Sequence, residues 1–224
     1  MRPMRLLLLN PNTSVHITER LAASARAALD AADALSALTA AEGPAVIASR
    51  EQAEAAAATV LAMARAHADG HDAVVLGVSL DCGLAATRAA LAPRALPVIG
   101  MTEAACLVAC TCGDRFGLLT LGPAMAPLYR EHVESLGLGS RLAAVDAPAL
   151  ERAFAPGGAR VEPEVLDVLA AGAQRLRAAG AGAIVLAGAV LCGYAEALRE
   201  RIGMPALDGV ACATRLARVR LALG

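Results

Sequence analysis

Aromatic side chains are nearly absent from this 224-residue chain, which has no tryptophan, two tyrosines and two phenylalanines. Hydrophobic residues nevertheless make up 57% of the sequence, so its core must consist of alanine, leucine and valine. Small apolar side chains of this kind suit helices that pack closely on a sheet. A chain of this length can bury a core as one large domain or as two small ones.

A dominant charge is lacking too, because the formal net charge is −1. No basic face is expected, which argues against a nucleic-acid partner. Every apolar stretch of about 18 residues contains charges or turn formers, so no membrane span is expected. The apolar run 1–9 leads into an Asn-Pro turn without a small-residue cleavage site, so no signal peptide is expected. Six cysteines in such a chain do not resemble a secreted disulfide framework, and a cytoplasmic protein is expected.

Short apolar runs alternate with helical patterns along the whole sequence. Strands are expected at 5–9, 34–39, 73–77, 97–100, 118–121, 183–187 and 206–207. Helices are expected from the capping residues 12–14 to about 32, and at 51–68, 85–91, 102–112, 123–135, 165–179, 195–202 and 212–223. This alternation predicts an α/β fold in which parallel strands are flanked by helices.

An internal repeat divides the chain. Residues 72–88 are similar to residues 183–198, and Cys82 falls on Cys192 at an offset of 192 − 82 = 110 residues. The starts of the halves are also similar, since RLLLLNP at 5–11 matches RFGLLTLGP at 115–123. We therefore expect two pseudo-symmetric lobes, 1–112 and 113–224, with a cleft between them. The chain ends can cross over between lobes.

The carboxyl ends of the expected strands carry the candidate site residues. Asn10, Thr120, Cys82 and Cys192 each follow a strand and are expected to face the shared cleft. The turn at 10–14 caps a helix, and its free N–H groups offer a place for an anion such as a carboxylate. Asp81 is expected to cap a helix, and Asp208 is either structural or a cleft residue.

Two thiols on opposite walls of a cleft can act as an acid/base pair. One removes a proton from a carbon acid and the other delivers a proton to the opposite face, without a cofactor. An ordinary thiol is little ionised at neutral pH, so a helix N-terminus after each Cys-Gly pair is expected to lower one pKa. The alternative is that Cys82 and Cys192 are small buried hydrophobes, as free cysteines often are.

The other cysteines are expected to pack in the core. Cys106 and Cys110 lie four residues apart on one expected helix, Cys112 ends that helix, and Cys212 begins the last one. Because no histidine or second cysteine pair has zinc-ligand spacing, no metal site is expected. His16, His71 and His132 have no partner that the sequence reveals.

Four segments resemble the hydantoin/allantoin racemase branch of the aspartate/glutamate racemase superfamily. They are LNPNTS at 9–14, PVIGMTEA at 97–104, RFGLLT at 115–120 and PALDGV at 205–210. The resemblance covers nearly the whole chain and implies two α/β lobes, a two-cysteine mechanism without cofactor, and a homo-oligomer.

The family's usual cysteine motifs, A-C-F-x-D-P-G-L and L-G-C-A-G-M-A-G, are not reproduced. Aligned without gaps, the first family cysteine falls on Val78 and the second on Gly188. Cys82 and Cys192 are both displaced from those places by four residues in the same direction. Either the acid/base pair has moved along each loop, or the usual chemistry is lost.

Three hypotheses follow. The first is a racemase or epimerase of a small hydantoin-like or amino-acid-like carbon acid, with Cys82 and Cys192 as the bases. Its substrate would be held by Asn10, Thr13 and Thr120 and by the N–H groups of Ser79 and Ala189. The second is a one-thiol decarboxylase or cis–trans isomerase of the same superfamily. The third is a small-molecule binder without catalytic bases.

Overall fold

The computed structural model describes residues 2–150 and 160–223, which form two similar α/β halves. In the first half the elements are β1 (Arg5–Asn10), α1 (Val15–Arg26), β2 (Ala34–Thr39), α2 (Arg50–His67), β3 (Ala73–Leu76), α3 (Leu84–Leu91), β4 (Val98–Gly100) and α4 (Met101–Ala109). In the second half they are β5 (Phe116–Leu119), α5 (Met125–Ser135), β6 (Leu142–Asp146), α6 (Pro163–Ala178), β7 (Ala183–Leu186), α7 (Ala195–Ile202), β8 (Ala206–Asp208) and α8 (Gly209–Ala222).

The sheets of the two halves have the same topology. Their strand orders are β2-β1-β3-β4 and β6-β5-β7-β8, and all the pairings are parallel. Leu9 pairs with Leu76 in the first sheet, and Leu119 pairs with Leu186 in the second, so both pairs keep the offset of 110 residues. The expected α/β class with two pseudo-symmetric parallel sheets is confirmed.

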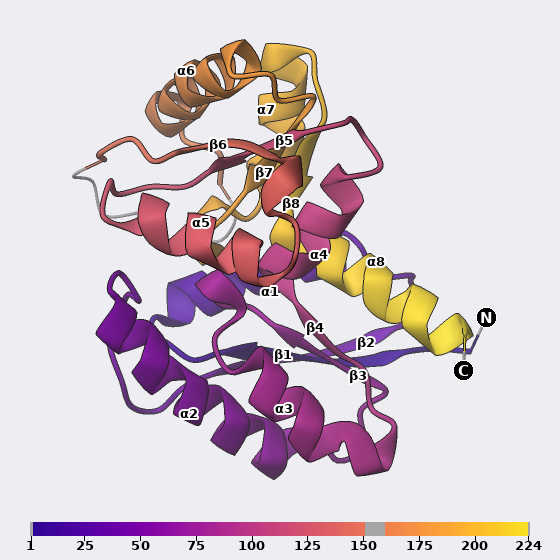
Figure 1. Ribbon diagram of the computed structural model, residues 1–224. Coiled ribbons are helices and arrows are strands. Elements are labelled where there is room, and N and C mark those ends of the chain that lie inside the picture. Colours follow the sequence, from indigo (N-terminus) through magenta and orange to yellow (C-terminus); the bar gives the residue numbers. More distant parts are fainter. Residues whose placement is uncertain (1, 151–159, 224) are drawn as a thin grey trace.

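Helices form a central layer between the two sheets and cover both outer faces (Figure 1). Helices α2 and α3 cover the first sheet, and α6 and α7 cover the second. Helices α1, α4, α5 and α8 lie between the sheets. The expected division after residue 112 falls in the turn between α4 and β5, yet α4 packs against β7 and β8. Helix α8 returns to pack against β3 and β4, so each half contributes a helix to the other's sheet.

The strands distribute their leucines between the layers by simple alternation. Leu6 and Leu8 belong to the central core, while Leu7 and Leu9 face the outer core beneath α2 and α3. Burying each such side chain contributes about 1.5–3 kcal/mol. Within the described ranges, no helix is long and apolar enough to cross a membrane.

Two elements differ from expectation. Helix α1 ends at Arg26 rather than near residue 32, because Asp33 accepts hydrogen bonds from the backbone N–H groups of Asp30 and Met4 and fixes a turn. Strand β6 was not expected from the sequence. It is a short edge strand whose residues are mostly half-buried, so it lacks the continuous apolar run of the inner strands.

Candidate active site

A pocket of about 430 Å³ lies where the two halves meet, beyond the carboxyl ends of the inner strands. Open parallel sheets bind ligands in this position. The first half contributes Asn12, Ser14, His16, Ile17, Ala45, Val46, Ile47, Ala48, Gly77, Val78 and Ser79 to its lining. The second half contributes Thr120, Leu121, Gly122, Met125, Tyr129, Leu150, Gly188, Ala189 and Val190.

Two equivalent loops form opposite walls of this pocket. Each leaves the third strand of its half, makes one 3-10 turn, passes through a cysteine and a glycine, and enters a helix. The backbone angles at the two cysteines are nearly the same, with φ −50° and ψ 126° at Cys82 and φ −58° and ψ 135° at Cys192. Only the beginnings of the loops, Gly77–Ser79 and Gly188–Val190, line the pocket.

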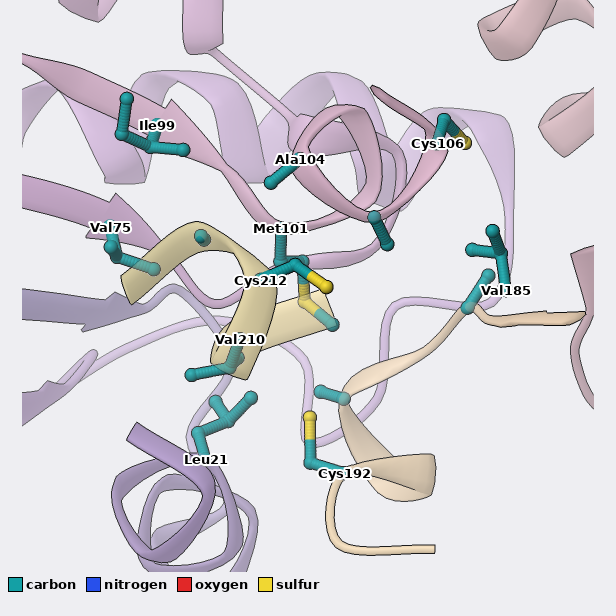
Figure 2. Close-up of a cluster of buried hydrophobic side chains, with 14 of the residues drawn as sticks. Leu21, Val75, Ile99, Met101, Ala104, Cys106, Val185, Cys192, Val210 and Cys212 are labelled. Carbon is teal, nitrogen blue, oxygen red and sulfur yellow. The ribbon is translucent and has the colours of Figure 1, made fainter. Parts of the chain in front are cut away.

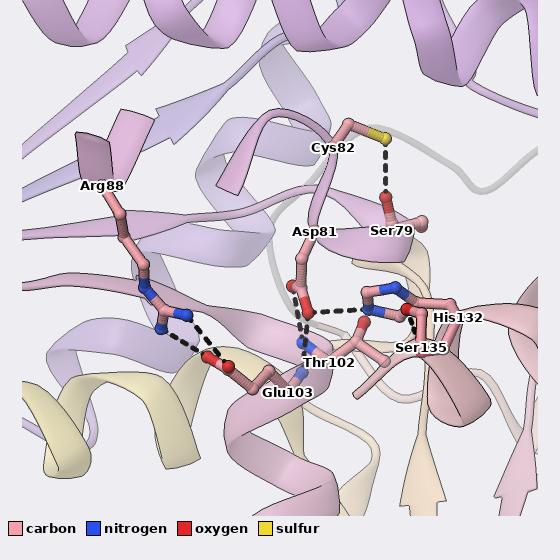
Figure 3. A network of polar contacts seen from close by, with 8 residues as sticks. All are labelled: Ser79, Asp81, Cys82, Arg88, Thr102, Glu103, His132 and Ser135. Carbon is pink, nitrogen blue, oxygen red and sulfur yellow. Dashed lines mark hydrogen bonds and ion pairs between the residues drawn. The ribbon is translucent and has the colours of Figure 1, made fainter. Parts of the chain in front are cut away.

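Cys82 lies behind the pocket wall. Its side chain belongs to the outer core beneath α2 and α3, and its Sγ donates a hydrogen bond to the carbonyl oxygen of Ser79 at 3.1 Å (Figure 3). Burial, and after it the charge of Asp81, raises the pKa of this thiol to about 12. Cys82 is therefore protonated at neutral pH.

Cys192 is buried in the central core, where Figure 2 shows it among apolar side chains of both halves. Burial, and after it the charge of Asp208, raises the pKa of its thiol well above the ordinary value. The expectation that a helix N-terminus lowers a thiol pKa is wrong for both residues, because burial and a neighbouring carboxylate dominate. Neither thiol lines the pocket, and their catalytic role stays a prediction.

Three of the five residues expected to bind a substrate line the pocket: Ser79, Thr120 and Ala189. Asn10 lies behind it, where its side-chain amide donates to Asn12 Oδ1 and Thr18 Oγ1, each at 2.9 Å. Asn10 thus shapes the turn that presents Asn12 to the pocket.

Thr13 also lies outside the lining, and its backbone N–H donates to the carbonyl oxygen of Pro44 at 3.1 Å. This contact fastens the segment after β2, in which residues 45–48 form an apolar wall of the pocket. The sequence analysis made no prediction for residues 45–48, because four apolar residues between a loop and a helix show no periodicity.

Tyr129 is a pocket residue that the sequence did not reveal. It comes from α5, is fully buried, and has a pKa that burial raises; hydrogen bonds with the side chains of Ser79 and Thr120 act in the opposite direction. These three hydroxyl groups come from both halves and offer the pocket a polar centre. That Tyr129 is one of only two tyrosines is the only sequence signal for it.

Strong charges are missing from the pocket. Of the described residues that line it, none is Asp, Glu, Lys or Arg, and His16 and Tyr129 are the titratable side chains. Across residues 2–150 and 160–223, no group of three or more His, Cys, Asp and Glu side chains could hold a metal ion.

A carboxylate expected near the site, that of Asp81, holds one of the loops. Asp81 caps α4 by accepting the N–H groups of Thr102 and Glu103 at 2.9 and 2.7 Å, so its expected capping role is confirmed. His132, for which the sequence showed no partner, pairs with Asp81 through Nε2 at 3.0 Å (Figure 3).

Of the remaining cysteines, Cys106 and Cys212 are buried as expected (Figure 2). Cys110 is only half-buried, and Cys112 is exposed. The expectation of core packing is wrong for Cys112, because it lies beyond the end of α4 in a solvent-facing turn.

Two matched parallel α/β halves with a pocket between them define the class of the protein: it is pseudo-symmetric, and its pocket has room for a small molecule. The model of the Asp/Glu/Hydantoin racemase family matches residues 6–217, and the chain belongs to that family. The family expected from the sequence is confirmed.

Relatives with assigned activities extend over nearly the whole chain. It is 32% identical over 225 residues to a hydantoin racemase of Paenarthrobacter aurescens, an alignment that covers 99% of this chain and 92% of that protein. It is 30% identical over 226 residues to a hydantoin racemase of Rhizobium meliloti, with 99% and 90% covered.

Among solved structures, the fold is similar to that of an allantoin racemase from Klebsiella pneumoniae, with a TM-score of 0.77 and 28% identity; 99% of this chain and 89% of that chain are covered. An unliganded arylmalonate decarboxylase shares the fold at 18% identity, with a TM-score of 0.64 and coverage of 100% and 94%.

Proposed function

We propose that the pocket binds a small uncharged molecule with ring or amide carbonyl groups and an apolar substituent, of the hydantoin kind. The names of the similar racemases support this ligand class. The lining supports it independently, because it offers hydroxyl groups but no arginine or lysine for a carboxylate. The apolar segment 45–48 and Leu121 suit a hydrocarbon substituent.

We further propose that the chain binds this ligand without racemising it by two thiols. Racemisation by two bases requires an acid and a base within about 3–3.5 Å of opposite faces of one carbon. The alignment with the family motifs assigns the two base positions to Val78 and Gly188, which line opposite walls of the pocket. An isopropyl group and a hydrogen atom then stand where the bases would be, and this observation carries the proposal.

The second candidate is a thiol-dependent isomerase that uses Cys82 and Cys192. It is favoured by family membership and by the occurrence of a thiol at the same point of both loops. It requires both loops to turn their cysteines into the pocket and one thiol pKa to fall, so that one thiol is ionised while the other carries the proton. The one-thiol alternatives, a decarboxylase or a cis–trans isomerase, require this of one loop only.

Proton NMR in deuterium oxide separates these candidates. Hydantoins that carry an isopropyl or benzyl group on the carbon acid serve as ligands, and saturation transfer detects their binding. Binding without loss of the carbon-acid proton signal beyond the protein-free rate supports our proposal. Protein-dependent exchange accompanied by racemisation supports the thiol isomerase instead, provided that Cys82→Ala and Cys192→Ala each abolish the racemisation. Absence of both binding and exchange refutes the hydantoin ligand class.

A further inference from the structure

Asp81 joins three parts of the molecule. It lies in the loop after β3, and its Oδ1 accepts the backbone N–H of Thr102 at 2.9 Å. Its Oδ2 accepts the N–H of Glu103 at 2.7 Å and pairs with Nε2 of His132 at 3.0 Å (Figure 3). The loop is thereby tied to the first turn of α4 and to α5, which belongs to the second half.

Asp208 makes the same three connections in the second half. Its Oδ2 accepts the N–H of Gly193, in the loop after β7, at 2.7 Å. Its Oδ1 accepts the N–H of Ala211, in the first turn of α8, at 3.0 Å. The same oxygen accepts the hydroxyl of Ser24 at 2.6 Å, and Ser24 lies on α1 of the first half.

The contacts of Asp81 and those of Asp208 form two equivalent junctions, each of which joins a loop, a helix of the same half and a helix of the other half. The carboxylate comes from the loop in the first junction and from the end of the fourth strand in the second. The offset of 110 residues places Asp81 opposite Leu191, so the loop supplies the carboxylate only in the first half. Gly100 and Asp208 both end the fourth strand of their sheet, so the strand supplies it only in the second half. A Cβ atom at Gly100 would lie 2.4 Å from Cγ of Asp81, which shows that the two positions share one space.

We infer that Asp81 and Asp208 are the positioning residues of the pocket, one for each wall. Each holds the loop whose first residues, Ser79 or Ala189, line the pocket. In the first loop, Leu80 and Asp81 have φ of 59° and 47°, a left-handed conformation that non-glycine residues rarely adopt. Three hydrogen bonds to the Asp81 carboxylate stabilise that conformation, as strained backbone requires.

The two tyrosines of the chain report on the two walls separately. Tyr129 lines the pocket near Ser79, and Tyr194 follows directly after the Gly193 that Asp208 binds. Fluorotyrosine labelling therefore gives two fluorine NMR signals, which Tyr129→Phe and Tyr194→Phe assign. We expect Asp81→Leu to shift or broaden the Tyr129 signal and Asp208→Leu to affect the Tyr194 signal.

The sharpest test transplants the second junction into the first half. Asp81→Leu removes three hydrogen bonds and should lower the unfolding midpoint by roughly 2–10 °C. Gly100→Asp alone should also destabilise, because its new carboxylate meets that of Asp81. The double variant places a leucine in the loop and an aspartate at the strand end, so it should recover at least half of the midpoint loss and the wild-type Tyr129 signal.

Asp72→Asn is the matched control, because Asp72 is also a buried carboxylate that accepts a backbone N–H, from Arg5 at 2.7 Å. It should lower the midpoint without changing either tyrosine signal. If Asp81→Leu does not fold, Asp81→Asn gives a milder loss with the same readout. An unchanged Tyr129 signal in a folded Asp81 variant, or a double variant no more stable than its worse parent, overturns the inference.

The fluorine measurements need no ligand, so they stand apart from the proposed function, on which only the link to binding rests. Isopropyl hydantoin supplies that link, with an expected loss of affinity of at least fivefold in Asp81→Leu and none in Asp72→Asn. If the wild-type protein binds no hydantoin while the tyrosine signals change as expected, the proposed hydantoin ligand is refuted, and the positioning role of Asp81 and Asp208 is still supported.

Discussion

The reactivity of the six cysteines gives the most direct test of the site. Cys82 has a pKa of about 12, compared with about 8.5 for an ordinary thiol. Near pH 8 its thiolate population is therefore roughly 3000-fold lower than that of an ordinary thiol. A more basic thiolate is also a better nucleophile, and with a Brønsted coefficient of about 0.4–0.5 this raises the rate per thiolate roughly 40-fold. Cys82 should thus react roughly 100-fold more slowly, before its burial slows it further.

The assay is modification of the native protein by a disulfide reagent, followed by peptide mass mapping at successive times. We expect Cys112 to react first, because it is exposed, and half-buried Cys110 to follow. Cys82 and Cys192 should be modified last, because both are buried. Between pH 7 and 10 the rate at Cys82 should rise about tenfold per pH unit without a plateau, because its pKa lies above this range.

The control is Cys112→Ala, which should remove the fastest phase and leave the slow thiols unchanged. All six thiols should react when the chain is unfolded in urea. If Cys82 and Cys192 are among the fast-reacting thiols of the folded protein, the burial argument is refuted and the two-thiol isomerase becomes the better interpretation. A fast Cys82 alone favours a one-thiol reaction.

Four further predictions concern stability and binding. Burial raises the pKa of Cys82, Cys106, Cys192 and Cys212, so the stability that their neutral folded forms contribute should be complete below about pH 8.5. Above that pH the free energy of unfolding should fall by about 1.4 kcal/mol per pH unit for each thiol. Urea unfolding at pH 7–10 measures this fall, and Cys106→Ala should reduce its slope by the share of one thiol. Gly117→Ala should lower the free energy of unfolding by about 1–3 kcal/mol, because its Cβ would lie 2.8 Å from Cβ of Leu176. Gly182→Ala should lower it far less, because its Cβ would lie 3.4 Å from Cα of Gly113; equal unfolding midpoints for the two variants would contradict this packing argument. Tyr129→Phe should weaken hydantoin binding by roughly 2–13-fold, the value of one hydrogen bond, and an unchanged Kd would remove Tyr129 from the ligand contacts. Val78→Cys should lower the free energy of unfolding by under about 1.5 kcal/mol, whereas Gly188→Cys should lower it by about 1–3 kcal/mol because the φ of Gly188 is +125°; equal unfolding midpoints for the two variants would contradict this backbone argument.

The fold was predictable from the sequence because its signals are local and occur twice. Continuous apolar runs such as residues 6–9 and 183–187 identify buried parallel strands, and the repeat gives both halves the same strand order. Strand β6 was not predicted, because an edge strand needs no continuous apolar run. The crossed packing of α4 and α8 was anticipated only as a possibility, since contacts between distant segments leave no local pattern.

The site was less predictable because it is assembled across the halves. Ser79, Thr120 and Ala189 were found because they follow strands directly, at the edge where parallel sheets bind ligands. Tyr129 and the wall at 45–48 reach the pocket from a helix and a loop, and nothing in their spacing shows this. Asn10 was placed at the correct strand end, but its amide turns inward to hold the Asn12 turn.

The matching positions of Cys82 and Cys192 have a structural explanation that does not need catalysis. Both residues leave a 3-10 turn with nearly the same backbone angles, and a glycine with φ of 78° or 90° follows each. By this point each loop has turned away from the pocket and entered a core, where a small apolar side chain fits and a free cysteine serves well. Equal backbone environments in a repeated chain favour equal side chains, so the coincidence of two thiols reflects the repeat. Residues 78 and 188 lie at equally matched positions and are among the residues that line the pocket, and their lack of an ionisable group is therefore the more informative observation.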